Sequence, residues 1–144
     1  MLKMQSVSDA PALRLRTETP FTSRQSSGGG SDAVWVYVAG ELDLTTAPQL
    51  EQTLREAQPE ARLVVLDLRE LTFVDSAGVH VIADAGIRSR RVGCRLIVVR
   101  APAQVDAVFT LVAVTGDVEV VDLDPGQPVV QALLQVSPDP SPVA

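Results

Sequence analysis

Two short segments of the chain have apolar residues on both faces of an expected strand, and they limit the fold more than any other feature. RLVVLDL at 62–68 and RLIVV at 95–99 lack the alternation of apolar and polar residues that marks a half-exposed strand. A continuous apolar pattern is typical of strands that are buried on both faces in a helix-covered parallel sheet. The two segments therefore predict central strands of an α/β fold.

Segments with helical periodicity lie before the first of these strands and between the two. A helix is expected over 46–57, with Thr46 as its cap and Gln49 completing a capping box. A second helix is expected over 76–91 and should end at Gly93. Its predicted buried stripe consists of Val79, Ile82, Ala83, Gly86 and Ile87.

The remaining pattern completes an alternating order of elements. Leu13 and Leu15 alternate with arginines, so we expect a strand that forms a hairpin with the next one through a flexible Gly/Ser-rich loop. The further expected ranges are strands 12–18, 33–40 and 118–122, the loop 19–32, and helices 103–113 and 128–136. This order predicts one α/β domain over 12–136, between a flexible N-terminal tail (1–11) and a C-terminal tail (137–144). We expect a mixed, mostly parallel β-sheet of about five strands with about four α-helices.

Composition excludes several classes of function. The formal net charge is -6, which disfavours direct binding to nucleic acid or to anionic membranes. One cysteine and one histidine allow neither an internal disulfide nor a Cys/His zinc site. No apolar run approaches the roughly 20 residues of a membrane-spanning helix, and the first residues lack a signal-peptide pattern. We therefore expect a cytoplasmic protein without a cofactor of its own.

The stretch Asp75-Ser76-Ala77-Gly78 opens the second predicted helix and carries the clearest functional signal. Free N–H groups and the helix dipole favour an anion at such a terminus. A phosphate on Ser76 would therefore be tolerated locally, while it adds about -1.5 to -2 charge. The alternative is an ordinary Asp or Ser helix cap.

A second motif precedes another helix. Gly40-Glu41-Leu42-Asp43 ends the strand before Thr46, and if both turns lie at one edge of the sheet, Asp43 and Ser76 are neighbours. Together, GELDLTTA at 40–47 and LTFVDSAGV at 71–79 resemble the motifs of the STAS domain, specifically of the bacterial anti-sigma factor antagonists. The resemblance extends over about 13–134, while the loop 19–32 and the segment 102–116 look longer than in the family.

The resemblance implies a non-enzymatic switch. The phosphorylated serine of the family corresponds to Ser76. The unphosphorylated form is expected to bind an anti-sigma factor that is also a serine kinase, which releases a sigma factor. Phosphorylation by that kinase, which uses ATP and Mg²⁺, ends the complex, and a serine phosphatase restores binding. The residues expected to contact the partner or to surround the phosphorylation site are Asp43, Thr45, Thr46, Asp75, Ala77, Gly78 and His80.

Other interpretations remain open. STAS domains also serve as regulatory subunits of membrane transporters, including ABC-type lipid transport systems, and as scaffolds of stress-signalling assemblies. Ser76, His80 and Asp84 have i, i+4, i+8 spacing, but the G-x-S-x-G elbow of a serine hydrolase is absent from the sequence. The arginines at 88, 90, 91 and 95 would attract an acidic partner or simply form a solvated helix end.

Overall fold

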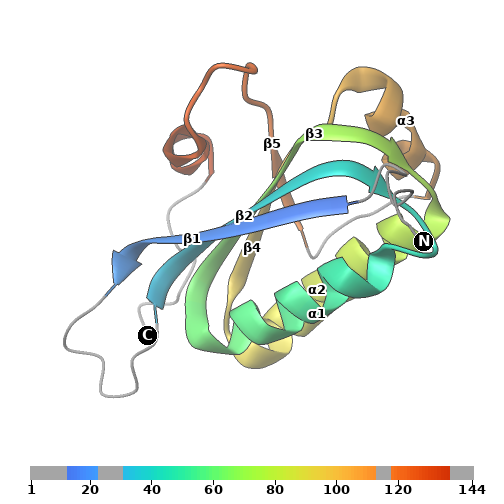
Figure 1. Ribbon diagram of the computed structural model, residues 1–144. Helices are drawn as coiled ribbons and strands as arrows, with labels where there is room; N and C mark the ends of the chain where they lie inside the picture. Colours follow the sequence, from blue (N-terminus) through green and yellow to red (C-terminus); the bar gives the residue numbers. More distant parts are fainter. Residues whose placement is uncertain (1–12, 23–30, 113–117, 137–144) are drawn as a thin grey trace, which may run out of the picture.

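The five strands form a single sheet in the order β1-β2-β3-β4-β5 in the computed structural model, which describes residues 13–22, 31–112 and 118–136. Strand β1 is antiparallel to β2, and every other pair of neighbours is parallel (Figure 1), as the sequence predicts. The elements are β1 (Leu13–Thr22), β2 (Ser31–Leu42), α1 (Ala47–Ala57), η2 (Gln58–Glu60), β3 (Ala61–Val74), α2 (Ser76–Val92), β4 (Arg95–Val99), α3 (Ala103–Val112), β5 (Glu119–Val121) and η3 (Val129–Leu134).

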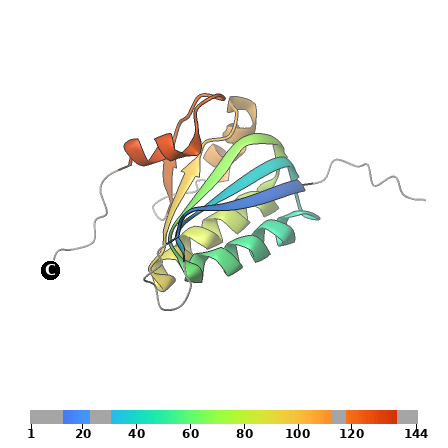
Figure 2. The ribbon, with the colours of Figure 1, turned by 60° about the vertical axis from the view of Figure 1, so that its left-hand side comes forward.

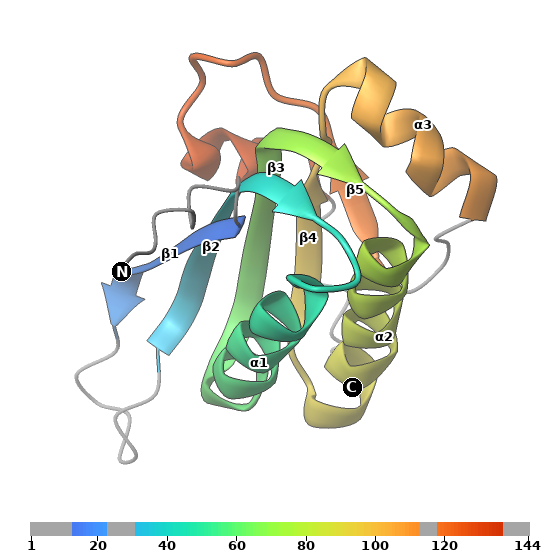
Figure 3. The same ribbon diagram turned by 45° about the vertical axis from the view of Figure 1, so that its right-hand side comes forward.

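Helices α1 and α2 lie side by side on one face of the sheet (Figure 3). Alternate residues of β3, such as Val64 and Leu66, pack against them, while Val65 points to the other face. This arrangement explains the continuous apolar pattern of β3, because both faces of the strand are buried. The fully buried side chains of the larger core include Leu42, Leu50, Leu54, Leu66, Leu68, Leu71 and Ile82.

The opposite face of the sheet is covered by the segment that contains η3 (Figure 2). Here Trp35 and Ile97 pack with Val129 and Ala132 in a smaller core, and Tyr37 packs against it, so the two aromatic residues share one face of the sheet. Arg69 fixes the covering segment, because its Nη1 donates to the carbonyl oxygens of Asp124 and Gln127 at 2.6 and 2.7 Å. The same guanidinium forms a two-pronged ion pair with the buried Asp67.

Several strands are longer than the sequence predicted. Residues 19–22 and 31–32, assigned to the flexible loop, belong to β1 and β2, while 23–30 lie outside the described residues. Strand β3 continues to Val74, because its end pairs with the end of β2 as far as Leu42. The polar segment RELT at 69–72 indicates a turn when only the sequence is considered. Pairing with the neighbouring strand outweighs this local polarity.

Three details of the helices are corrected. The Thr46 side chain makes no capping bond to α1, so the expected capping box is absent. Ile87 is 45% exposed and Ala83 is only half-buried, so neither belongs to the buried stripe of α2, because the helix turns its Val81 and Ala85 inward instead. The last predicted helix is a 3₁₀ helix, η3. Ala113 and the predicted tails lie outside the described residues.

Candidate functional site

Ser76 is the first residue of helix α2, and its side chain is exposed. The residue stands at the carboxyl end of β3, where the chain turns from the sheet into the helix (Figure 3). The N-terminal ends of α2 and α1 lie at the same edge of the sheet, since both follow parallel neighbouring strands. The candidate site is therefore formed by two turns, here called the GELD loop (40–46) and the DSAG turn (75–78).

Asp75 joins these two turns. Its Oδ1 accepts a hydrogen bond from the Gly78 backbone N–H at 3.1 Å, which caps α2. Its Oδ2 accepts from the Leu44 N–H at 3.2 Å, and the Asp75 N–H donates to the Leu42 carbonyl oxygen at 3.1 Å. One carboxylate thus caps a helix and fixes the neighbouring loop, so the two motifs are in direct contact, as the sequence predicted for motifs at one edge.

Asp43 organises the GELD loop. Its Oδ1 accepts from the Thr45 N–H and hydroxyl at 3.0 and 2.8 Å and from the Thr46 N–H at 3.1 Å. These bonds, that of the Thr45 hydroxyl above all, lower the pKa of the Asp43 carboxyl against a weaker opposing effect of desolvation. The buried Thr46 hydroxyl donates to the Glu41 carbonyl oxygen at 2.7 Å, which closes the loop in place of capping α1.

Gly78 is buried where α2 passes over the end of the sheet. A Cβ atom at this position would lie 2.5 Å from Leu42 Cγ and 2.9 Å from Val74 Cγ2. Both neighbours are core side chains, so they have little room to move. Gly78 therefore permits close packing between the DSAG turn and the GELD loop.

Two large apolar side chains are exposed in the segments that form the candidate site. Leu44 is 75% exposed at the tip of the GELD loop, and Phe73 is 47% exposed at the end of β3. His80, one helical turn after Ser76, is exposed, Thr45 is exposed and Ala77 is half-buried. Large apolar residues on a surface loop mark a contact surface more often than a catalytic centre.

The structure provides no support for catalysis by the Ser76, His80 and Asp84 series. All three side chains are exposed, and no hydrogen bond joins them among the described residues. Cys94, the other nucleophilic side chain, is buried, which raises the pKa of its thiol to about 11. Within the described part of the chain, no group of three or more His, Cys, Asp or Glu residues is placed to hold a metal ion.

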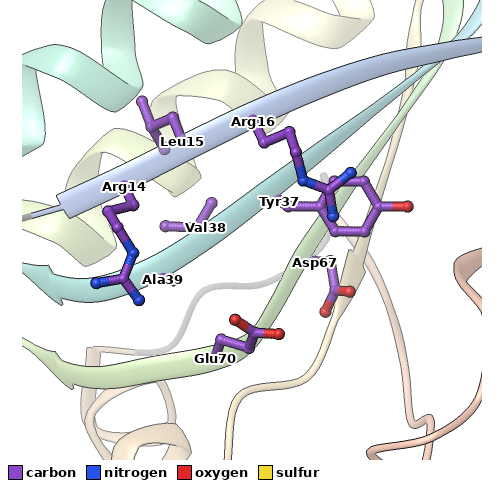
Figure 4. Close-up of a pocket in the computed structure, with 8 residues that line it drawn as sticks. All are labelled: Arg14, Leu15, Arg16, Tyr37, Val38, Ala39, Asp67 and Glu70. Carbon is purple, nitrogen blue, oxygen red and sulfur yellow. The ribbon is translucent and has the colours of Figure 1, made fainter.

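A hollow of about 270 Å³ lies on the opposite face of the sheet, over β1, β2 and β3 (Figure 4). Two of its charged side chains, Arg16 and Asp67, are already paired with residues outside its lining. The Arg16 guanidinium stacks 3.8 Å from the centre of the Tyr37 ring and pairs with Glu18, and Asp67 pairs with Arg69. The hollow is separated from Ser76 by the thickness of the sheet and takes no part in the candidate site.

The sequence did not indicate the roles of Leu44, Phe73 and Arg69. A signal existed for Leu44, since an apolar residue between Asp43 and Thr45 in a loop has no core to enter. Phe73 gave no such signal, because it lies within an apolar stretch at the end of a strand. Arg69 had no such signal, because its partners are backbone carbonyl oxygens of residues far along the chain.

Solved structures resemble this fold. The anti-sigma factor antagonist SpoIIAA in its unphosphorylated form is 18% identical, with a TM-score of 0.63 over 86% of this chain and 100% of that one. The phosphorylated SpoIIAA of Bacillus gives a TM-score of 0.60 at 19% identity over the same shares. An anti-sigma factor antagonist from Mycobacterium paratuberculosis gives 0.53 at 22% identity over 84% of this chain and 92% of that one.

Sequence comparison leads to the same fold. The anti-sigma-B factor antagonist of Listeria monocytogenes is 29% identical over 94 residues, which cover 65% of this chain and 80% of that protein. None of the helices formed by the described residues has the length and apolar character needed to cross a membrane. The family model described as "Mlab, STAS domain" matches residues 28–125, more than half of the chain and both motifs of the candidate site. The chain therefore belongs to the STAS domain family.

Proposed function

We propose that this protein is an anti-sigma factor antagonist that is controlled by phosphorylation of Ser76. In its unphosphorylated form it binds an anti-sigma factor that is also a serine kinase, and a sigma factor is released. Phosphorylation ends the complex, and a serine phosphatase restores it. The observation that carries the proposal is the exposed hydroxyl of Ser76 on a turn that Asp75 and Gly78 hold rigidly against the GELD loop.

The surroundings of Ser76 suit a protein partner. Leu44 and Phe73 present apolar side chains on the two segments that meet beside the serine. Burial of such side chains in an interface contributes affinity at about 25 cal/mol per Å² of apolar surface, before the costs of association are subtracted. A kinase that binds this surface would hold the Ser76 hydroxyl at the interface, where phosphorylation changes the contact directly.

Electrostatics explain why phosphorylation would release the partner. The first turn of α2 offers free N–H groups and the positive end of the helix dipole, so a phosphate does not unfold the turn. It nevertheless adds about -1.5 to -2 charge beside Asp75 and near the loop of Asp43. In a dehydrated interface this charge suffers repulsion and loses hydration. The switch therefore acts on affinity for the partner and leaves the fold intact.

The names of similar proteins support the same role. Two Listeria relatives are called anti-sigma-B factor antagonists, and SpoIIAA is described in both an unphosphorylated and a phosphorylated form. The protein would not be an enzyme and would need no cofactor of its own, since the kinase binds ATP and Mg²⁺. Such a switch operates in the cytoplasm with the sigma factor.

The decisive experiment is incubation of the full chain with ATP, Mg²⁺ and the candidate anti-sigma kinases of the same genome. Mass spectrometry of peptides should show one phosphate on Ser76, and the modified protein should lose the kinase in a binding assay. Ser76→Ala should accept no phosphate, whereas Thr72→Ala, which removes another exposed hydroxyl nearby, should be phosphorylated normally. Absence of phosphate from the wild-type chain with every candidate kinase would contradict the proposal.

A second function is favoured by the description of the matching family model, "Mlab, STAS domain". A regulatory subunit of a membrane transporter, or a scaffold of a stress-signalling assembly, would use the same loops to bind a partner. Co-purification discriminates between the functions. Stable recovery with an ATPase subunit of a transporter, unaffected by Ser76→Asp, would favour the second function.

A further inference from the structure

A groove lies between the C-terminal ends of α1 and α2, far from the Ser76 turn. It has a volume of about 430 Å³. Three arginines line it together with one carboxylate and two aliphatic side chains, in a protein whose formal net charge is -6. The lining residues of this arginine groove are Arg55, Asp84, Ile87, Arg88, Arg91 and Val92.

The guanidinium of Arg88 is held in place by a buried glutamine. Its Nη1 donates to Gln58 Oε1 at 2.8 Å. Gln58 is fully buried, and its Nε2 donates to the Ala85 carbonyl oxygen at 2.7 Å, which fixes the amide against α2. A cation that is already ordered loses less conformational entropy when it binds an anion. Arg88 is therefore a preorganised positive group at the side of the groove.

The positive charge of the groove is only partly compensated from within the molecule. Arg55 forms an exposed ion pair with Glu51 at 3.3 Å, whereas Arg88 and Arg91 form none among the described residues. Asp84 lies one helical turn before Arg88 and offsets part of its charge. Desolvation and then the neighbouring Arg55 lower the pKa of Arg88. An incoming carboxylate would relieve this repulsion.

Two apolar side chains lie in the same groove. Ile87 is 45% exposed and Val92 is 42% exposed, although the helix has a full core face of its own. Ile87 and Arg91 are one turn apart on α2, and so are Arg88 and Val92, so apolar and cationic groups alternate along one side of the helix. Arginines beside exposed aliphatic groups are typical of protein interfaces.

We propose that the arginine groove docks an acidic segment of a partner protein, with a carboxylate against Arg88 and Arg91 and a neighbouring apolar side chain against Ile87 and Val92. Charge complementarity selects this occupant. Arg88 follows Ser76 by about 18 Å along the helix axis. The groove is therefore a separate site from the DSAG turn, and the inference goes beyond the proposed switch. The docked segment itself would not touch Ser76 in either state of that residue.

The test uses the full chain and a fluorescein-labelled synthetic peptide of alternating glutamate and leucine. Fluorescence anisotropy at about 0.02 M NaCl should show saturable binding, which weakens at about 0.3 M NaCl because exposed charges are screened. Arg91→Glu should weaken binding about fivefold. Ile87→Ser should also weaken binding, which a purely electrostatic attraction would not predict.

The matched control is Arg14→Glu, which makes the same change in charge at an exposed arginine of β1. It should leave peptide binding within about twofold of wild type. Equal weakening by Arg14→Glu and Arg91→Glu, or absence of binding at low salt, would overturn the proposal. Phosphorylation of Ser76 should be normal in Arg91→Glu, so failure of the groove and failure of the switch give different results.

Discussion

The two ends of helix α2 are held in place by different interactions. At the N-terminal end, Asp75 accepts two backbone hydrogen bonds, and Gly78 lies against core side chains without room for a methyl group. At the C-terminal end, Gly93 ends the helix with φ 76°, and a Cβ there would meet nothing within 4 Å. Close packing fixes one end, whereas a left-handed glycine and backbone hydrogen bonds to the Ser89 carbonyl oxygen fix the other.

This difference teaches how a switch and a docking surface can share one helix. Under the proposed switch, phosphorylation of Ser76 would add charge to a turn that packing already holds, so the signal would depend on a partner that senses this charge. The C-terminal end has open space, exposed apolar groups, and two arginines, Arg88 and Arg91, without an ion pair among the described residues, so the proposed partner would need no rearrangement of the core. The predictions below test whether packing and conformation can be separated in this way.

The largest effect is expected for Gly78→Ala. The new methyl group would stand 2.5 Å from Leu42 Cγ and 2.8 Å from Leu42 Cδ2, so the core must shift. Overpacking of this kind costs about 2–3 kcal/mol, and the better helix propensity of alanine returns less than about 1 kcal/mol. Urea unfolding should therefore show a loss of about 2 kcal/mol. The control is Gly126→Ala, where a Cβ meets nothing within 4 Å, and a similar loss there would contradict the packing argument.

Asp75→Ala should have the next largest effect. It removes the cap of α2 and the bond to the Leu44 N–H together. Loss of a helix cap alone costs about 1 kcal/mol, and the released loop adds to this, so we expect about 1.5–2 kcal/mol by urea unfolding. Asp75→Asn keeps one acceptor oxygen and should lose about half as much. If the two variants were equally stable, the hydrogen bond that the asparagine oxygen can still accept would contribute nothing to stability.

How much of the structure the sequence predicted depends on how far apart along the chain the interacting residues lie. The run 95–99, the Ser76 start and the Gly93 stop of α2 were predicted correctly, because local patterns determine them. The contact between the two motifs was expected only from the rule that parallel strands end at one edge. That Asp75 is the residue that joins the motifs could not be predicted, because its second bond spans 31 positions of the chain.

The errors have the same physical cause. Ile87 has the spacing of a core residue, but the small Ala85 faces the sheet instead, and Ile87 enters the arginine groove. The Thr46 hydroxyl is used by Glu41 of the preceding strand, so it is not available as a cap. In both cases a tertiary contact competed with a local rule and prevailed.

Gly93→Ala tests the C-terminal end of the comparison. The residue adopts φ 76° in open space, so alanine meets no neighbour and is disfavoured only by its own backbone conformation. This costs about 1 kcal/mol, roughly half the loss expected for Gly78→Ala. Gly93→Asn should be milder, because asparagine tolerates the left-handed region. A loss for Gly93→Ala that equals that of Gly78→Ala would remove the distinction between the two ends.

The smallest effect concerns pH and the GELD loop. Hydrogen bonds lower the pKa of Asp43 below its ordinary value of 3.8 in the folded protein, so between the folded and unfolded pKa values the unfolded chain binds more protons. The stabilisation is complete above the unfolded pKa and is lost as the pH falls through the folded one. The stability difference between wild type and Asp43→Asn should therefore be constant from about pH 5 to 7 and shrink below about pH 4. Arg91→Gln, at the other end of α2, should shift stability equally at every pH in this range, because arginine stays protonated. If the difference in stability between wild type and Asp43→Asn were as large below about pH 4 as it is at about pH 7, the hydrogen bonds would not depend on the charge of the carboxylate.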